Sequence, residues 1–119
     1  MPHSHATVAL LDNQDTGLDM LAELANGAGM AALPARDLNE LAMVLGRSCV
    51  DLLVINATNL QVPLAVVFTQ LAAALQRASV LVLVEANDVA TAVDAMALGA
   101  KNALTLPIEP GRFKRYLTQ

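Results

Sequence analysis

Short runs of mainly aliphatic residues recur along the chain, and each run is closed by a residue that favours a turn or a helix start. The runs that suit buried strands are 6–11, 30–33, 51–55, 79–84 and 102–105. Their apolar residues are nearly continuous instead of alternating with polar ones, which is typical of strands covered on both faces. The pattern therefore predicts five short buried strands.

Between these runs, apolar residues recur at intervals of three and four positions, which is typical of amphipathic helices. In the first such segment (17–25), Leu18 and Leu21 share a face, and Asn26 and Gly27 should end the helix. The other helices are expected to begin at Asp37, Pro63, Asp88 and Pro110. We expect the last of them to be cut short by the end of the chain.

Three residues should close further elements: Gly46 and Gly99 the second and fourth helices, and Pro34 the second strand. A strand followed by a helix, five times over, demands a parallel sheet with helices on both faces. We expect a flavodoxin-like, doubly wound α/β sheet in the order 2-1-3-4-5. The whole chain (1–119) should form one domain with a flexible arm at 1–5.

The composition narrows the class of protein. The net charge is −4 and the one basic cluster is Arg112, Lys114 and Arg115, which is typical of a solvated helix turn. We therefore expect no nucleic-acid binding by this domain. The single cysteine, Cys49, excludes an internal disulfide and is expected to be buried. No signal peptide and no membrane-spanning run is visible, which favours a cytoplasmic protein without membrane contact.

Two patterns that resemble ligand motifs are better explained by structure. The segment 27–32 fits a GxGxxA dinucleotide fingerprint, but it follows a helix and precedes a strand, the reverse of the required order. His3 and His5 form an HxH pair on the expected arm, and no third ligand is near in sequence. We expect neither a metal nor a cofactor to bind at either place.

Ligands of doubly wound sheets bind beyond the carboxyl ends of the strands, where the strand order reverses. Here that point lies between the first and third strands. The residues that the strand ends deliver are Asp12, Asn13, Asn56, Ala57, Val84, Glu85, Thr105 and Leu106. Mg²⁺ usually requires one or two carboxylates together with phosphate oxygens. Asp12 alone would therefore bind Mg²⁺ only weakly. The alternative is that Asp12 caps the following helix.

Three segments, in the right order, resemble the receiver domain of response regulators (CheY-like). The segment 98–107 is similar to the family's stretch from the end of helix four through strand five to a Lys-Pro pair. The segment 8–13 resembles the approach to its acidic pair, and 51–56 resembles the strand that carries its phosphoryl acceptor. The resemblance covers essentially the whole chain and implies phosphorelay signal transduction in a two-component system.

This sequence departs from the receiver pattern where the family's chemistry resides. The acceptor aspartate falls on Asn56, and the acidic pair falls on Asp12 and Asn13. The other three positions carry Val84 for a Thr or Ser, Ala103 for an aromatic and Leu106 for a lysine. An amide cannot replace a carboxylate nucleophile, and fewer carboxylates weaken Mg²⁺ binding. The departures imply a degenerate pseudo-receiver that is not an enzyme.

Three functions remain open. The first is a phosphorylation-independent interaction module that regulates a protein partner or its own output domain, such as a transcription regulator. The second is a phosphoacceptor that uses Asp51, which lies at the wrong end of its strand, or Glu85, which lacks a neighbouring lysine. The third is a small-ligand sensor in a pocket made apolar by Val84 and Leu106, although we expect side chains to fill that pocket.

The third helix offers a candidate interface for a partner or a second copy of the chain. No charged residue occurs between Asp51 and Arg77. The core-facing stripe should be Leu64, Val67, Phe68, Leu71 and Leu75, and the opposite face carries Val62, Val66, Thr69 and Ala73. An exposed apolar face often marks a partner surface. The rival location is the usual receiver dimer surface on the fourth helix, fifth strand and fifth helix.

Overall fold

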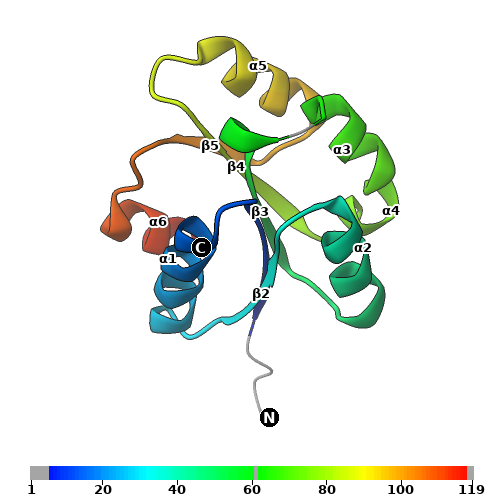
Figure 1. Ribbon diagram of the computed structural model, residues 1–119, viewed down its shortest axis with the longest axis vertical. Helices are drawn as coiled ribbons and strands as arrows, with labels where there is room; N and C mark the ends of the chain where they lie inside the picture. Colours follow the sequence, from blue (N-terminus) through cyan, green and yellow to red (C-terminus); the bar gives the residue numbers. More distant parts are fainter. Residues whose placement is uncertain (1–5, 61, 118–119) are drawn as a thin grey trace.

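The computed structural model describes residues 6–60 and 62–117, which form a parallel sheet wrapped by helices (Figure 1). The strands are β1 (Thr7–Leu11), β2 (Ala31–Ala35), β3 (Leu52–Asn56), β4 (Ser79–Val84) and β5 (Asn102–Thr105). Their order is β2-β1-β3-β4-β5, and every neighbouring pair is parallel. The predicted sheet is confirmed.

Two layers of helices cover this sheet. The helices are α1 (Asp15–Gly27), α2 (Leu38–Arg47), α3 (Leu64–Gln70), α4 (Ala72–Leu75), α5 (Val89–Leu98) and α6 (Pro110–Leu117), with a short 3₁₀ helix η1 (Ala57–Asn59) after β3. Figure 1 shows α1 and α6 side by side on one face, and α2, α3 and α5 on the other. This arrangement matches the doubly wound α/β class that the sequence predicts.

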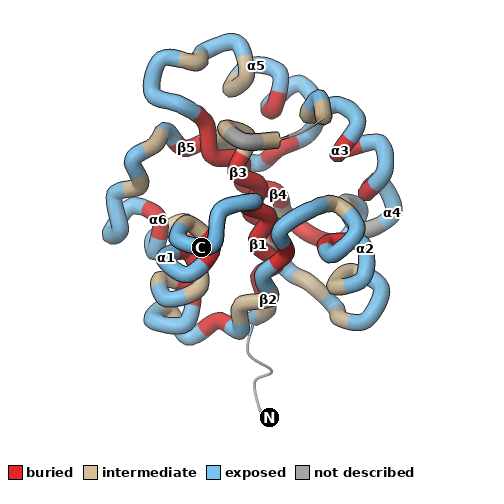
Figure 2. The backbone as a smooth tube through the Cα atoms, viewed as in Figure 1, coloured by how far each residue is buried: buried red, intermediate tan, exposed pale blue. Residues whose placement is uncertain are grey.

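The strands are buried from both sides, which explains their continuous apolar sequences. In β1, Ala9 and Leu11 pack with α2, α3 and α5, whereas Val8 and Leu10 pack with α1 and α6. All four are essentially inaccessible to solvent. Figure 2 shows the buried residues concentrated along the central strands and the helices exposed on their outer sides. A period of two along each strand therefore fills two separate hydrophobic layers.

Local sequence signals set the ends of two helices. Asp37 caps α2 by accepting the backbone N–H of Glu40 at 2.8 Å. Asp88 caps α5 by accepting the backbone N–H and the hydroxyl of Thr91 at 3.0 and 2.5 Å. The side-chain bond from Thr91, followed by the backbone bond, lowers the pKa of Asp88. Gly99, at a left-handed φ of 115°, ends α5.

Four expectations about the chain were wrong. Gly46 does not end α2, because it lacks the positive φ of a helix-ending glycine and the helix continues to Arg47. Pro34 does not end β2 but lies inside it, because β2 is an edge strand and one side of its backbone needs no hydrogen bonds. Cys49 is exposed, because it lies in the turn between α2 and β3 and not in the strand. The third helix breaks at Leu71 into α3 and α4. The side chain of Leu75 lies outside the described part of the chain.

Candidate functional site

The candidate site lies where β1 and β3 end side by side. The two strands pair in parallel up to Leu11 and Ile55, so the next residues, Asp12 and Asn56, emerge at the same edge. A backbone bond from the N–H of Asp12 to the carbonyl of Ala35 holds the end of β1 against β2. The structure therefore brings these two predicted residues together at the point where the strand order reverses.

Asp12 is a buried carboxylate that is only 3% exposed. Its Oδ1 accepts the backbone N–H of Gln14 at 3.0 Å, and its Oδ2 accepts the side-chain amide Nδ2 of Asn56 at 2.9 Å. Because Gln14 is the N-cap residue immediately before α1, the carboxylate lies at the positive end of that helix. The capping alternative for Asp12 is thus favoured, although Asp12 is not itself the N-cap residue.

Gly17 makes this placement possible, a role that sequence reasoning missed. A Cβ atom at position 17 would lie 2.3 Å from Oδ2 of Asp12, a distance that no real contact permits. The first turn of α1 therefore closes directly over the carboxylate, and only glycine fits there. In the sequence, Gly17 was only the first residue of the predicted helix segment (17–25), and that pattern gave no signal of a contact with Asp12.

Asn56 uses both ends of its amide. Its Nδ2 donates to Asp12, and its Oδ1 accepts the backbone N–H and the hydroxyl of Thr58 at 3.0 and 2.7 Å. Thr58 belongs to η1 and was not predicted as a site residue. The three residues form one network that joins the ends of β1 and β3 to η1. Within the described residues, no buried side-chain nitrogen or oxygen lacks a partner.

The remaining predicted site residues are placed less closely together. Leu106 is half-buried at the edge, and its N–H donates to the carbonyl of Val84 at 2.8 Å; the Leu106–Pro107 peptide is cis. Val84 is buried among the residues of α2, α3 and α5, and Ala103 lies inside β5 opposite Val82. Asn13 is exposed. One hollow brings together four of the residues predicted at the strand ends: Asp12, Asn56, Glu85 and Leu106.

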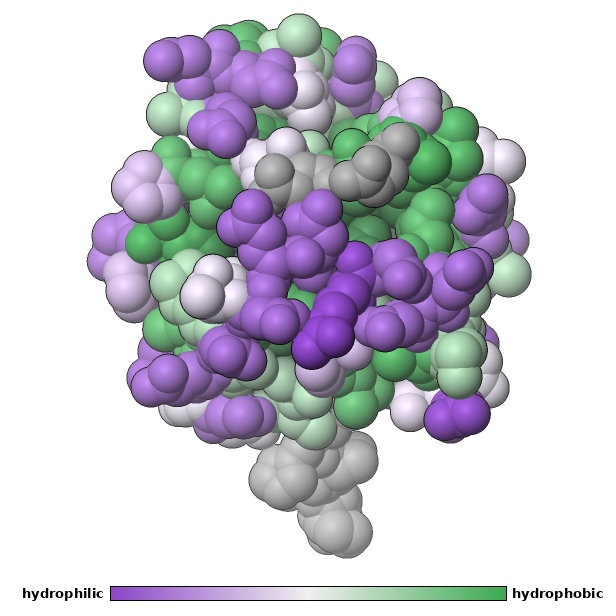
Figure 3. Space-filling model, viewed as in Figure 1, coloured by the Kyte–Doolittle hydropathy of each residue, from purple (hydrophilic) through white to green (hydrophobic). Residues whose placement is uncertain are grey.

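Two hollows flank the Asp12–Asn56 pair. From the sequence we expected side chains to fill this region, and they do not. The larger hollow, of about 510 Å³, lies between α1, the strand ends and the segment that follows β5. The smaller hollow, of about 260 Å³, lies between the ends of β1 and β3 and the start of α2 and includes Asn13. In Figure 3, hydrophilic side chains gather over the centre of this face and apolar patches border them on both sides.

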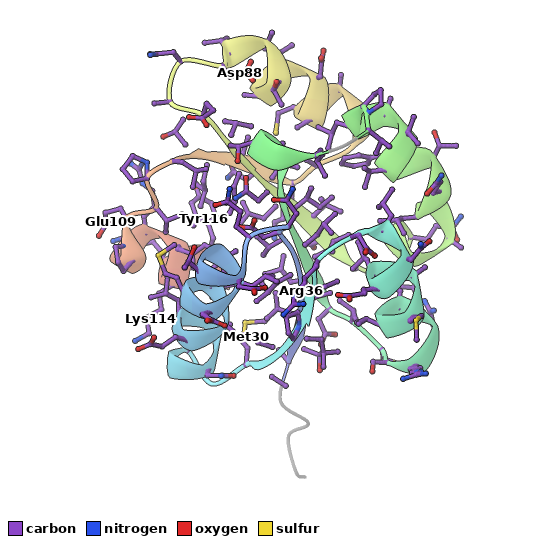
Figure 4. All side chains as sticks on the ribbon, in the orientation of Figure 1. Met30, Arg36, Asp88, Glu109, Lys114 and Tyr116 are labelled. Atoms are coloured by element: carbon purple, nitrogen blue, oxygen red, sulfur yellow. The ribbon has the colours of Figure 1, made fainter. Side chains whose placement is uncertain are left out.

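An exposed ion pair lies near the smaller hollow. Nε of Arg36 is 2.8 Å from Oδ1 of Asp15, which links the end of β2 to the start of α1. Figure 4 shows Arg36 near the centre of the face, well away from Glu109, which lies at the start of α6. Pairs exposed to this degree contribute little to stability. Arg36 lines the smaller hollow but not the larger one.

Two alternative positions, Asp51 and the segment 27–32, lie away from the Asp12–Asn56 pair. Asp51 lies at the amino edge of the sheet, where its Oδ2 accepts the N–H of Thr7 at 2.9 Å. The GxGxxA segment (27–32) forms the end of α1, a turn and the start of β2, as expected. His3 and His5 lie outside the described residues. Within 6–60 and 62–117, no group of three His, Cys, Asp or Glu residues is placed to hold a metal ion.

The apolar surface predicted on the third helix is smaller than the sequence suggested. Val62 is half-buried against the core, Val66 is 36% exposed, and the hydroxyl of Thr69 donates to the carbonyl of Ala65. Ala73 is exposed on the short helix α4. Only Val66 therefore offers a large exposed apolar side chain among the four candidates.

A more exposed apolar stripe lies on α5, which includes part of the rival location. Val89, Val93 and Met96 are 69%, 60% and 48% exposed. Their spacing of four and three residues places them on one side of the helix. Three large apolar side chains aligned on one helix are a stronger indication of a contact surface than single scattered ones.

No protein-family model matches the sequence, and no curated protein matches it either. Solved structures do match. The chemotaxis response regulator CheY4 of Vibrio cholerae superposes with a TM-score of 0.84 at 16% identity, over 97% of this chain and 98% of that one. Full-length FixJ from B. japonicum gives 0.81 at 22%, over 97% of this chain and 57% of that one. The NtrC4 receiver domain dimer gives 0.83 at 19%, over 94% and 93%.

These matches define the class of fold. The chain has the CheY-like, flavodoxin-type fold of response-regulator receiver domains, as its sequence predicted. At these levels of identity, similarity establishes the architecture, and the chemistry must be derived from this chain's own residues. Among the helices in 6–60 and 62–117, none has the length and apolar character required to cross a bilayer.

Proposed function

We propose that this chain is a receiver-like regulatory module of a signal-transduction protein that works without accepting a phosphoryl group. It is not an enzyme, and it acts by protein–protein contact with a partner or with its own output domain. The observation that carries this proposal is the hydrogen bond between the Asn56 amide and the Asp12 carboxylate. An amide stands where the fold's chemistry would require a nucleophilic carboxylate.

The surroundings of Asn56 support the same conclusion. Phosphoryl transfer depends on cations that neutralise the charge of the transferred group. Among the described residues that line the larger hollow, no lysine or arginine occurs, and Leu106 contributes an aliphatic side chain. The carboxylates that line it are Asp12, which is buried, and Glu85, which is exposed. A phosphoryl group would therefore find no lysine or arginine among these residues to neutralise its charge.

The hydrogen-bond network links the strand ends directly. Asn56 donates to Asp12 and accepts twice from Thr58, so β1, β3 and η1 are held in one arrangement. Buried networks whose groups are all satisfied are rigid. We infer that the module keeps one conformation and that regulation comes from its binding partners.

The stripe on α5 supports action by protein contact, and a second copy of the chain is one possible partner. Replacement of Val93 by Glu should weaken association at least about tenfold, because a charge in an apolar contact must be desolvated. Val66→Glu tests the competing surface on α3. Sedimentation and light scattering of both variants would distinguish the surfaces. If Val93→Glu associates normally, the α5 surface is wrong, and a monomer without any partner contradicts both.

Mass spectrometry after incubation with Mg²⁺ and acetyl phosphate tests the central claim. The mass of the chain should remain unchanged. CheY4 of Vibrio cholerae, a chemotaxis response regulator, provides a comparison protein for the same reaction. A stoichiometric phospho-adduct on any residue, including Asp51 or Glu85, would contradict the proposal.

A second candidate function, that of a small-ligand sensor, is favoured by the two hollows beside Asp12 and Asn56. The larger one falls within the size range of ordinary small-molecule sites. A thermal-shift screen against metabolites would test this function. A ligand that raises the midpoint of unfolding, and loses that effect when the hollow is altered, would establish it.

A further inference from the structure

The larger hollow has a definite chemical character. It lies between α1, the ends of β1, β3 and β4, and the segment between β5 and α6. The described residues that line it are Asp12, Gln14, Thr16, Gly17, Met20, Leu21, Asn56, Thr58, Leu83, Glu85, Leu106 and Ile108. They divide into a negatively charged polar part and an aliphatic part.

The polar part favours a positive charge. Asp12 and Glu85 are carboxylates, and no lysine, arginine or histidine is among the described lining residues. The chain as a whole carries a net charge of −4. An anion entering the hollow would be repelled, whereas a cation would be attracted. The phosphate-binding chemistry of the fold is therefore reversed here.

Asp12 retains the capacity to bind another donor. A carboxylate offers about four acceptor positions. The described contacts of Asp12 use one position on each oxygen, for the N–H of Gln14 and the Nδ2 of Asn56. Both donors are uncharged, and no described cation forms an ion pair with this 3% exposed carboxylate. An ammonium group would add the charge-assisted bonds that neutral donors cannot provide.

The aliphatic part favours a hydrocarbon. Leu106 and Ile108 are half-buried, and Met20 is 44% exposed although it lines the hollow. Figure 3 shows apolar surface beside the hydrophilic centre on the side of the segment between β5 and α6. A ligand that covers these side chains would remove apolar surface from water. A bare metal ion would leave that surface exposed.

From this combination we propose that the larger hollow binds a small primary aliphatic amine in its ammonium form. The ammonium lies toward Asp12 and Glu85, and the alkyl chain lies against Leu106 and Ile108. This inference goes beyond the regulatory function proposed above. Different experiments can contradict amine binding and the regulatory function. A phospho-adduct would contradict that function without touching amine binding, and the experiment below measures binding alone.

Calorimetric titration of the full chain with pentylamine, pentanol and pentanoate provides the test. We expect saturable binding of pentylamine at neutral pH and low salt, at least about tenfold tighter than that of the other two. Leu106→Lys should weaken pentylamine binding at least about tenfold, because it places a cation in the hollow. Glu85→Gln should weaken it about threefold, since that carboxylate is exposed.

Met43→Lys is the matched control, because it adds the same charge on the exposed side of α2 outside the hollow. Its affinity for pentylamine should equal that of the unaltered chain. The proposal is overturned if pentanol or pentanoate binds as tightly as the amine. It is also overturned if Leu106→Lys binds normally, or if no saturable binding occurs.

Discussion

The ends of β1 and β3 and the ends of β4 and β5 form two halves of the same edge, yet they are built from opposite chemistry. The first half holds Asp12, Asn56 and Thr58, whose buried polar atoms are joined in one network. The second half holds Val84, which is part of the hydrophobic core, and Leu106, which is half-buried. The edge is therefore polar where β1 and β3 meet, and beside it the buried and half-buried side chains are aliphatic, while Glu85 is exposed at the end of β4.

The difference shows that the two halves of the edge are held together by physically distinct interactions. In the first half an uncharged amide preserves a bridge between strands, so the local architecture depends on complete hydrogen bonding. In the second half the aliphatic side chains need no partners, and they extend the core outward. The first half should therefore tolerate substitution poorly, and the second half should tolerate it according to burial.

Asn56→Asp should have the largest effect on the polar half. It would place two buried carboxylates at hydrogen-bond distance and destabilise the fold by about 3–5 kcal/mol at neutral pH. Acid should reduce the loss, because the pair can then share a proton. Urea unfolding at two pH values measures both effects. Asn13→Asp makes the same change at an exposed position and should cost less than about 0.5 kcal/mol.

The same Asn56→Asp variant should remain unphosphorylated by acetyl phosphate with Mg²⁺. Leu106 still supplies no cation, and Asn13 still supplies no second acidic ligand. Efficient labelling of this single variant would show that neither a cation at position 106 nor a carboxylate at position 13 is required.

Gly17→Ala should have the next largest effect. The added Cβ would lie 2.3 Å from Oδ2 of Asp12, so the first turn of α1 must shift at a cost of about 1–3 kcal/mol. Gly46→Ala in α2 is the control, because nothing lies within 4 Å of its Cβ position. That change should stabilise the protein by about 0.5–1 kcal/mol. Equal midpoints of thermal unfolding for the two variants would be inconsistent with a close approach at Gly17.

Val84→Thr examines the aliphatic half at its most buried point. Val84 is only 1% exposed, and its methyl groups pack with α2, α3 and α5. A hydroxyl there should cost about 1–2 kcal/mol, since it enters an apolar layer. Denaturant unfolding would measure the loss. No loss at all would mean that the hydroxyl finds a partner and that this half is more polar than described.

Leu106→Lys should have the smallest effect alone, within about 0.5 kcal/mol, because the lysine stem can lie over the apolar wall. Combined with Asn56→Asp, it should recover about 1 kcal/mol by pairing with the carboxylates across the hollow. A double-mutant cycle measures that coupling. Strict additivity would indicate that the two halves do not interact.

The sequence predicts the strands well because each is short, apolar and closed by a turn residue. The bounds of β4 (79–84) and β5 (102–105) agree with their predictions residue by residue. The capping roles of Asp37 and Asp88 were also predictable, because an N-cap needs only a neighbour three residues away. Helix caps of this kind can be predicted from the sequence without knowledge of the fold.

The details of the site depend on contacts between distant segments, and these were harder to predict. Asp12 and Asn56 could be placed at one edge by strand order, but their direct bond spans 44 positions of sequence. Gly17 lies close to Asp12, and the hydroxyl of Thr58 donates to Asn56, so both details could be predicted only once that bond is known. Val84 was predicted at the pocket but packs into the core, since strand residues alternate between layers.

The proline inside β2 has a consequence for how this molecule meets other chains. Exposed edge strands can recruit a strand from another protein and so invite fibrous aggregation. At Pro34 the backbone has no N–H to donate to such a strand. The opposite edge, β5, is four residues long and is followed within two residues by Pro107. With both borders of the sheet poorly suited to strand addition, recognition is left to the helices, and the molecule is protected from stacking into a continuous sheet.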